Sequence, residues 1–471
     1  MADHKTLIRR HFDRYAAQRQ RWIDRNRLYH EDLRRFFERA VEPGKRVLEV
    51  GSGTGDLLAA LKPSHGVGID ISHAFVELAR ARHPELAFLE MDVEALDLDE
   101  TFDYVILSGT LGYLTDIQGA LTNLRRVCHP DTRVIAVFHN DLWEPVLRFG
   151  ALIGERMPLP DENWLSTDDV VNLLDLTGFR VVKKGKRLLF PREVPLIAPL
   201  LNLAGQLPLL NQLCLTGYVI ARPESQTKPA HDFSVSVIVP ARNERGNIEA
   251  VMQRMPRLGR ETEVVFVEGH SSDGTFEEIE RVAAEYGKHW NIKVLKQDGR
   301  GKGDAVRKGF AAASGDMLII LDADLTVAPE DLPKFVDVLA GGRAELANGC
   351  RLVYPVPGQA MPVVNTFANK LFGNMFSYLL GQRFKDTLCG TKALWRRDYD
   401  KIAAARSYFG DFDPFGDFDL LFGASRLNLH IVDVPVRYHE RAYGRSNIQH
   451  VRAGFLLLRM CVYAARKLKF S

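Results

Sequence analysis

Short apolar runs alternate with amphipathic stretches over the first 222 residues. Apolar side chains recur at helical spacing between residues 6 and 40, which predicts one or two N-terminal helices. Strand-like runs follow at 46–51, 66–71, 87–91, 102–108 and 133–138, with helical patterns around 55–62, 72–82 and 116–128. This alternation predicts an α/β domain built on a doubly wound, mostly parallel sheet.

The last part of this region contains a long uncharged stretch. A capping-box pattern at Ser166 and Asp169 predicts a helix that ends at Gly178, and the run 216–223 predicts a late strand that closes the unit. Residues 194–221 carry no charge, but prolines interrupt them, so we expect an interfacial or lid segment rather than a membrane-spanning helix.

A second α/β pattern begins after a short linker. We expect a first domain at 1–222, a linker at 223–232, a second domain at 233–449 and a basic amphipathic helix at 450–471. Strand-like runs of the second domain lie at 234–241, 263–269, 292–297 and 316–324, and helical runs lie near 247–255, 275–286, 303–313 and 330–340. The C-terminal helix either contacts an anionic membrane surface or packs on its own domain.

The composition is that of a globular protein. Hydrophobic residues make up 46% of the 471 residues and charged residues 26%, which argues against a disordered chain or a polytopic membrane protein. The formal net charge is +2, too balanced for a dedicated nucleic-acid-binding protein. The five cysteines are widely spaced, so we expect neither a zinc site nor disulfides. Together with a charged N-terminus, this predicts a cytoplasmic protein, which could be peripheral on the inner face of the membrane.

A glycine-rich turn follows the first predicted strand. Glu49 is followed by Gly51, Gly53 and Gly55, and glycines in such a turn let the backbone pass close to a bound cofactor at a helix N-terminus. The ends of the next two strands also carry polar groups. Asp70 is placed to accept ribose hydroxyls, and the pair Asp92 and Val93 is placed to bind an adenine.

This combination resembles the class I S-adenosylmethionine-dependent methyltransferases over about residues 10–222. The resemblance implies a Rossmann-like fold with S-adenosylmethionine as cofactor, and Ser108 facing its methionine end. The methyl acceptor is not given by the pattern, since alignment alone can drive methyl transfer. Tyr29-His30 and His139 are candidate proton acceptors, but a satisfied surface or core position accounts better for each histidine. The alternative for the whole domain is a scaffold that has lost activity.

The second domain carries polar residues at the ends of successive strands. Pro240 ends the first strand rigidly and is followed by Arg242 and Glu244. Glu268 and Asp273 follow the second strand, where carboxylates can hold a nucleobase and ribose.

The end of the fourth strand carries two carboxylates with one residue between them. Asp322 and Asp324 predict a hard-oxygen site for Mg²⁺ or Mn²⁺, and Lys302 precedes them in a glycine-rich turn. In this order the motifs resemble the inverting family 2 glycosyltransferases of the GT-A fold over about residues 234–450. The dolichol-phosphate-mannose-synthase-like, or polyprenyl-phosphate, branch is the most similar.

This second resemblance implies a set of roles. The nucleotide of a UDP- or GDP-sugar donor would contact Pro240, Arg242, Glu244, Glu268 and Asp273. The metal held by Asp322 and Asp324 would bridge the donor diphosphate, next to Lys302, and neutralise the leaving group. The acceptor would be a lipid phosphate or a glycan.

The acceptor side is less clearly defined. Arg441, Gly444 and Ser446 match an R-x-x-G-x-S segment in which Arg441 would clamp phosphate oxygens. Asp417 and Asp419 are both candidate catalytic carboxylates near the acceptor, and the sequence does not choose between them. The helix expected at 365–381 either covers the acceptor site or belongs to the core.

Three departures weaken a lipid-phosphate acceptor without affecting the metal site. Glu268 is followed by Gly269 where the family often has a second acid, the FDxE pattern lacks its glutamate at Leu421, and Asn447 replaces a common lysine. We therefore expect a bifunctional enzyme of glycan or glycolipid biosynthesis that transfers both a sugar and a methyl group. The alternatives are an active glycosyltransferase with a non-catalytic S-adenosylmethionine-binding regulatory or scaffold domain, and a non-catalytic assembly factor.

Overall fold

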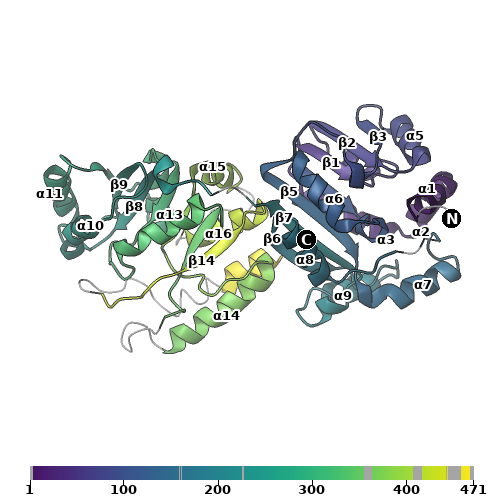
Figure 1. Ribbon diagram of the computed structural model, residues 1–471. Coiled ribbons are helices and arrows are strands. Elements are labelled where there is room, and N and C mark those ends of the chain that lie inside the picture. Colours follow the sequence, from purple (N-terminus) through teal and green to yellow (C-terminus); the bar gives the residue numbers. More distant parts are fainter. Residues whose placement is uncertain are drawn as a thin grey trace. The chain divides into compact units, whose positions relative to one another are not determined.

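The chain divides into two compact units, Met1–Glu224 and Ser225–Ser471, which are described separately (Figure 1). The computed structural model describes residues 4–158, 160, 162–224, 227–354, 363–406, 416–441, 443 and 458–466, with the backbone alone at 363–368 and 417. Each unit contains a mixed sheet of seven strands. The predicted fold class, two successive α/β domains, is therefore confirmed.

The first sheet is parallel through five strands and antiparallel at one end. Its strands are β1 (Arg46–Val50), β2 (His65–Asp70), β3 (Ala87–Glu90), β4 (Phe102–Ser108), β5 (Cys128–His139), β6 (Phe179–Arg187) and β7 (Thr216–Pro223). They are arranged in the order β3-β2-β1-β4-β5-β7-β6, in which β7 pairs antiparallel with both β5 and β6. The late strand therefore lies inside the sheet, and β6, which the sequence analysis missed, forms its edge.

Helices cover both faces of this sheet. On one face α3 (Arg27–Ala40), α4 (Asp56–Ala60) and α5 (His73–Arg82) pack against apolar side chains of β1, β4 and β5. On the other face lie α6 (Ile117–Leu124) and α8 (Thr167–Leu176), whose first turn has the predicted capping box at Ser166 and Asp169. The remaining helices of this unit are α1 (His4–Tyr15), α2 (Arg19–Arg25), α7 (Glu144–Leu152) and α9 (Ile197–Ala204). Its short helices are η1 (Ala16–Gln18), η2 (Val93–Ala95), η3 (Leu111–Tyr113), η4 (Arg125–Val127), η5 (Asp141–Trp143) and η6 (Leu210–Leu213).

The second sheet has a parallel half and a mixed half. Its strands are β8 (Ser234–Ala241), β9 (Glu261–Glu268), β10 (Asn291–Lys296), β11 (Met317–Ile320), β12 (Leu346–Cys350), β13 (Lys392–Trp395) and β14 (Ile431–Pro435). Their order is β10-β9-β8-β11-β13-β12-β14, and β13 is antiparallel to both of its neighbours. The first four strands match the runs expected from the sequence, whereas β12, β13 and β14 were not anticipated.

Two apolar layers enclose the second sheet. One contains α10 (Ile248–Arg254), α11 (Thr275–Tyr286) and α13 (Leu332–Ala340). The other contains α12 (Lys302–Ala312), α14 (Val363–Leu380), α15 (Arg396–Ala404) and α16 (Asp417–Arg426). Phe372 and Phe376 of α14 are buried in this second layer, so the helix expected at 365–381 belongs to the core.

The described part of the C-terminal helix comprises residues 458–466. Met460, Cys461 and Ala464 are buried in the same core as α14, while Leu458 and Val462 are exposed. Contact of this helix with a membrane stays a prediction. Within the described ranges, no helix has the length and apolar character needed to cross a bilayer.

Candidate functional sites

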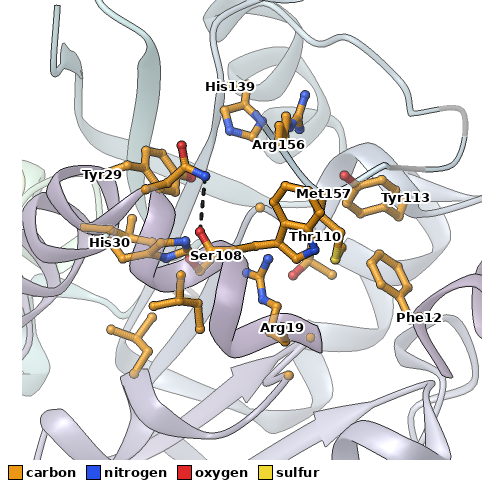
Figure 2. A pocket seen from close by; sticks show the side chains of 18 of the residues that line it. Phe12, Arg19, Tyr29, His30, Ser108, Thr110, Tyr113, His139, Arg156 and Met157 are labelled. Atoms are coloured by element: carbon orange, nitrogen blue, oxygen red, sulfur yellow. Dashed lines mark hydrogen bonds between the residues drawn. The ribbon is translucent and has the colours of Figure 1, made fainter. Parts of the chain in front are cut away.

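A cavity of about 620 Å³ lies at the carboxyl ends of the parallel strands of the first unit. The glycine turn after β1, Asp70 at the end of β2 and Ser108 at the end of β4 all line it. Side chains from α2 and α3 close it from the other side, and Figure 2 shows Arg19, Tyr29, His30, Ser108 and His139 gathered around the same space. Sequence-distant residues therefore share one cavity because parallel strands end at one sheet edge.

The three glycines of the turn all have positive φ, between 53° and 76°. A Cβ atom at Gly51 would lie 2.4 Å from Oγ1 of Thr110, and one at Gly55 would lie 2.5 Å from the ring of Phe88. At Gly53, by contrast, no described residue apart from its chain neighbours has an atom within 4 Å of the Cβ position, although Gly53 lines the cavity. The turn thus leaves free space against the backbone, which a bound cofactor can fill.

This difference predicts the effect of Gly53→Ala. We expect the added methyl group to occupy cofactor space and to weaken S-adenosylhomocysteine binding by about tenfold, measured by calorimetry. The positive φ costs about 1–2 kcal/mol of folding stability. Gly44→Ala is the matched control, because Gly44 also has positive φ and free space around it but does not line the cavity. Equal cofactor affinity in the two variants would contradict the assigned position of the cofactor.

Asp70 accepts backbone hydrogen bonds through both carboxylate oxygens, one of them from the glycine turn. Oδ2 accepts a hydrogen bond from the Gly53 N–H (2.9 Å), and Oδ1 accepts one from the Ser72 N–H (2.9 Å). Burial raises the pKa of Asp70 to about 6, although these backbone bonds oppose the shift. Since each carboxylate oxygen can accept a second hydrogen bond, the group still has capacity for ribose hydroxyls.

Glu49 and Asp92 have different surroundings. The Glu49 carboxylate is buried and accepts a hydrogen bond from the Leu58 N–H (3.1 Å), and burial raises its pKa. Asp92 faces the cavity beside the buried Val93, and its Oδ2 pairs with Lys5 of α1 (2.7 Å). All of the residues predicted to bind the cofactor except Gly55 line this cavity.

Aromatic rings from α3 and the end of β5 form one wall of the cavity. The ring of Tyr29 stacks on His139 at 5.8 Å and meets the ring of His30 edge-on at 5.0 Å. Burial and a nearby arginine together lower the pKa of both histidines to about 3. The arginine is Arg19 for His30 and Arg156 for His139. Neither imidazole has a hydrogen bond within the described part of the chain. Both are therefore neutral groups able to accept a hydrogen bond from a methyl acceptor.

Sequence reasoning missed the arginines that face this cavity. Arg19 begins α2, and its side chain has no ion pair or hydrogen bond among the described residues. Arg156 pairs with Glu162 (3.4 Å). Burial lowers the pKa of Arg19. These residues come from helices and loops outside the strand-end motifs, so no local pattern marks them.

In the second unit the predicted carboxylates meet at one sheet edge. Arg441 bridges two of them, with Nη2 at 2.5 Å from Asp324 Oδ2 and Nη1 at 3.4 Å from Glu244 Oε1. Burial raises the pKa of Glu244 to about 7, and the negative charge of Asp324 adds to the shift. Asp324 also accepts hydrogen bonds from the backbone N–H and hydroxyl of Thr326.

The charge of Asp322 is neutralised by a lysine and not by Arg441. Lys302, the first residue of α12, lies with Nζ 2.5 Å from Asp322 Oδ1. Burial opposes ionisation of Asp322, but Lys302, together with Lys392 and Arg351, lowers its pKa. A Cβ atom at Gly390 would clash with both Lys302 and Asp322, so this close pair requires glycine there.

The donor set of Asp322 and Asp324 fits a hard divalent cation. Carboxylate oxygens are the preferred ligands of Mg²⁺ and Mn²⁺, which commonly take their remaining ligands from water and substrate phosphates. No group of three or more His, Cys, Asp or Glu residues that could hold a metal occurs among the residues that the structure describes. Two carboxylates alone would leave most coordination positions of such an ion to other ligands.

The nucleotide-side residues surround the same edge. Asp273 accepts hydrogen bonds from the backbone N–H and hydroxyl of Thr275; burial opposes its ionisation, but these bonds lower its pKa. The buried Glu268 accepts from the Ser271 N–H, Arg242 is exposed, and Pro240 lies at the end of β8.

The acceptor-side predictions are only partly described. Asp419 of α16 pairs with Arg406 (2.7 Å), whereas the side chain of Asp417 lies outside the described residues, as do Gly444, Ser446 and Asn447. A further buried pair was not predicted: Arg351 contacts both oxygens of Asp386, at 2.7 and 2.9 Å. Within this pair, the charge of Arg351 helps to lower the pKa of Asp322.

Two family models match the chain. Residues 47–131 match a methyltransferase domain, and residues 236–402 match glycosyl transferase family 2. The second region is 36% identical over 224 residues to a dolichol-phosphate mannosyltransferase of Pyrococcus furiosus, covering 46% of this chain and 60% of the relative. It is 26% identical to an undecaprenyl-phosphate 4-deoxy-4-formamido-L-arabinose transferase of Klebsiella pneumoniae, covering 46% of this chain and 63% of that relative. This chain thus spans less than two thirds of the length of either relative.

The first region also resembles a solved structure. A S-adenosylmethionine-dependent methyltransferase from Thermotoga maritima, 19% identical, covers 46% of this chain and 99% of its own, with a TM-score of 0.37. The methyltransferase domain of the first unit is identified by the family match over residues 47–131.

Proposed function

Since the chain joins a methyltransferase domain to a family 2 glycosyltransferase domain, we propose that it is a bifunctional transferase. The second unit transfers a sugar from a nucleotide-sugar donor to a polyprenyl phosphate, and the first unit methylates the resulting glycolipid. The observation that carries the proposal is the presence of two separate strand-edge sites in one chain. One is the cavity of the glycine turn, and the other is the cluster of Glu244, Asp322, Asp324 and Arg441.

Sugar transfer is assigned to the cluster in the second unit. Asp322 and Asp324 would hold Mg²⁺ or Mn²⁺, whose charge would stabilise the leaving nucleoside diphosphate. Arg441, which already bridges Asp324 and Glu244, would bind phosphate oxygens of the donor. Glu268 and Asp273 would hold the nucleobase and ribose.

The acceptor side supports a lipid phosphate. A sugar hydroxyl must lose a proton during transfer, whereas a phosphate is already ionised and requires mainly alignment. Asp419 is paired with Arg406, an arrangement suited to positioning rather than to proton abstraction. The names of the relatives, which specify dolichol phosphate and undecaprenyl phosphate, support the same acceptor class.

Methyl transfer is assigned to the cavity in the first unit. S-Adenosylmethionine would supply an electrophilic methyl group. Asp70 would accept hydrogen bonds from the ribose, and Asp92 and Val93 would bind the adenine. The neutral imidazoles of His30 and His139 can accept a hydrogen bond from an acceptor hydroxyl and orient it.

The glycosyl transfer is tested by release of nucleoside diphosphate from UDP-, GDP- and dTDP-sugars with Mg²⁺ or Mn²⁺. We expect release from one donor to require the metal and to rise when polyprenyl phosphate is added. Release that is independent of the lipid would contradict the proposed acceptor, and a glycan would then be the alternative. Release without metal would contradict the role of Asp322 and Asp324.

A further inference from the structure

The first unit exposes an unusual amount of apolar surface around α7 and α9. We call this surface the apolar strip. Most of the exposed large hydrophobic side chains of the described chain belong to it: Leu142, Val146, Phe149, Leu152, Ile153, Leu196, Ile197, Leu200, Leu203, Leu207, Leu209 and Leu213. Leu152 is 85% exposed, and Leu196 and Leu209 are each 87% exposed. Contiguous apolar surface on this scale marks an interaction site in soluble proteins.

The two parts of the apolar strip form one surface. At the start of α7, the Trp143 indole N–H donates to the Leu213 carbonyl (2.8 Å). Just before it, the Asn140 amide donates to the Cys214 carbonyl (2.7 Å). Beyond the end of α7, Glu155 pairs with Arg192 (2.7 Å). Both ends of α7 are therefore tied to the segment that contains α9 and η6, and Figure 1 shows α7 and α9 along the same edge of this unit.

The apolar strip is continuous with the cavity. Val146, Phe149 and Ile153 are each more than half exposed, and the same three side chains line the cavity. Phe190 and Leu215 extend the apolar lining beside them. No residue of α7 is buried, which is unusual for a helix of a soluble domain. The strip therefore borders the entrance to the cavity.

The charge pattern identifies an apolar occupant. On α7, Arg148 Nη2 forms an ion pair with Glu144 Oε1 at 2.8 Å, so the two charges cancel. Residues 194–221 carry no charge at all. An occupant of this strip would thus be held by burial of hydrocarbon and not by ionic attraction. A second copy of the chain, or any other protein surface, seated over Val146, Phe149 and Ile153 would also block the entrance. A lipid surface would instead deliver the acceptor there.

We propose that the apolar strip inserts into the surface of a lipid bilayer, so that the cavity opens toward the membrane and accepts the head group of a membrane-borne glycolipid. This inference rests on the proposed function, because it names the class of acceptor for the same methyl-transfer site. It also gives the two activities a common substrate, since the relatives of the second unit are named for polyprenyl phosphates.

Flotation of the intact chain with vesicles of phosphatidylcholine tests the proposal. These vesicles carry no net charge, so binding through the basic C-terminal residues is excluded. We expect the wild type to float with the vesicles at both low and high salt. The triple variant Leu152→Glu, Leu200→Glu, Leu209→Glu should bind about tenfold or more weakly, because each of these side chains would lose hydrocarbon burial. None of the three lines the cavity.

The matched control is Leu176→Glu, which changes an exposed leucine on α8 that lies outside the strip and should leave flotation unchanged. Failure of the wild type to bind neutral vesicles, or equal binding by the triple variant, would overturn the proposal. Light scattering that shows a dimer converted to a monomer by the triple variant would also overturn it, because the strip would then be a protein interface. Binding of S-adenosylhomocysteine to the wild type is measured in parallel by calorimetry. If the wild type does not bind it, the proposed methyl transfer is refuted, whatever the flotation result.

Discussion

Replacement of Asp324 by alanine is expected to lower sugar transfer about a thousandfold, because a bound metal contributes several kcal/mol to stabilising the leaving group. Asp324 is the carboxylate whose Oδ2 contacts Arg441 and whose Oδ1 is fixed by Thr326. Its removal would take away one proposed metal ligand and one ionic partner of Arg441. The measurement is release of nucleoside diphosphate from the preferred donor in the presence of Mn²⁺.

Two comparisons make this result specific. Asp337→Ala removes an exposed carboxylate on α13 of the same unit and should retain full transfer. S-Adenosylhomocysteine affinity should be the same in both variants, because the cofactor cavity belongs to the other unit. Transfer that survives in Asp324→Ala would mean that this carboxylate does not hold the metal.

Replacement of Asp70 by asparagine is expected to weaken S-adenosylhomocysteine binding by about 10- to 100-fold. Hydrogen bonds to a charged group contribute about 1.5–3 kcal/mol, and the amide keeps only one acceptor oxygen. Asp70 must accept hydrogen bonds from the Gly53 and Ser72 N–H groups and also from the ribose hydroxyls. An amide has one acceptor oxygen too few to make all of these bonds. Calorimetry at pH 7.5 measures the effect, with Asp97→Asn, an exposed carboxylate outside the cavity, as the control.

The raised pKa of Asp70 adds a pH dependence. Burial raises this pKa to about 6, so the carboxyl becomes protonated, and loses acceptor capacity, as the pH falls below that value. Wild-type affinity for the cofactor should therefore fall between pH 7 and pH 5, and the fall should be absent in Asp70→Asn. Unchanged affinity in the variant, or the same pH profile in both proteins, would count against a ribose-binding role.

The parallel halves of both sheets could be predicted from the sequence because their strands are apolar and separated by helical patterns. The strands that were missed have other physical signatures. In β6, Lys183, Lys184 and Lys186 interrupt any apolar run, as is usual for an edge strand. β13 has only four residues, and its antiparallel pairing with both β11 and β12 determines its position. Such a strand depends on contacts that are distant in sequence.

The residues of the candidate sites also divide into those that the sequence predicts and those that only the fold identifies. Asp70, Ser108, Glu268 and Asp324 could be predicted because side chains at the carboxyl ends of parallel strands meet at one edge. The side chains that complete each site come from other elements. Arg19 reaches the cavity from an N-terminal helix, and the Arg351–Asp386 pair joins segments 35 residues apart. No spacing rule connects such residues, so only the fold identifies them.

The central claim is that both units act on one glycolipid. It is tested most directly by incubating the intact chain with methyl-labelled S-adenosylmethionine, polyprenyl phosphate, the preferred nucleotide-sugar and Mn²⁺, and then measuring the label in the lipid extract. We predict that lipid-bound label appears only when the nucleotide-sugar and the polyprenyl phosphate are both present, and that it disappears in Asp324→Ala. Label that enters the lipid without the nucleotide-sugar, or no label in lipid that has been glycosylated, would contradict the account.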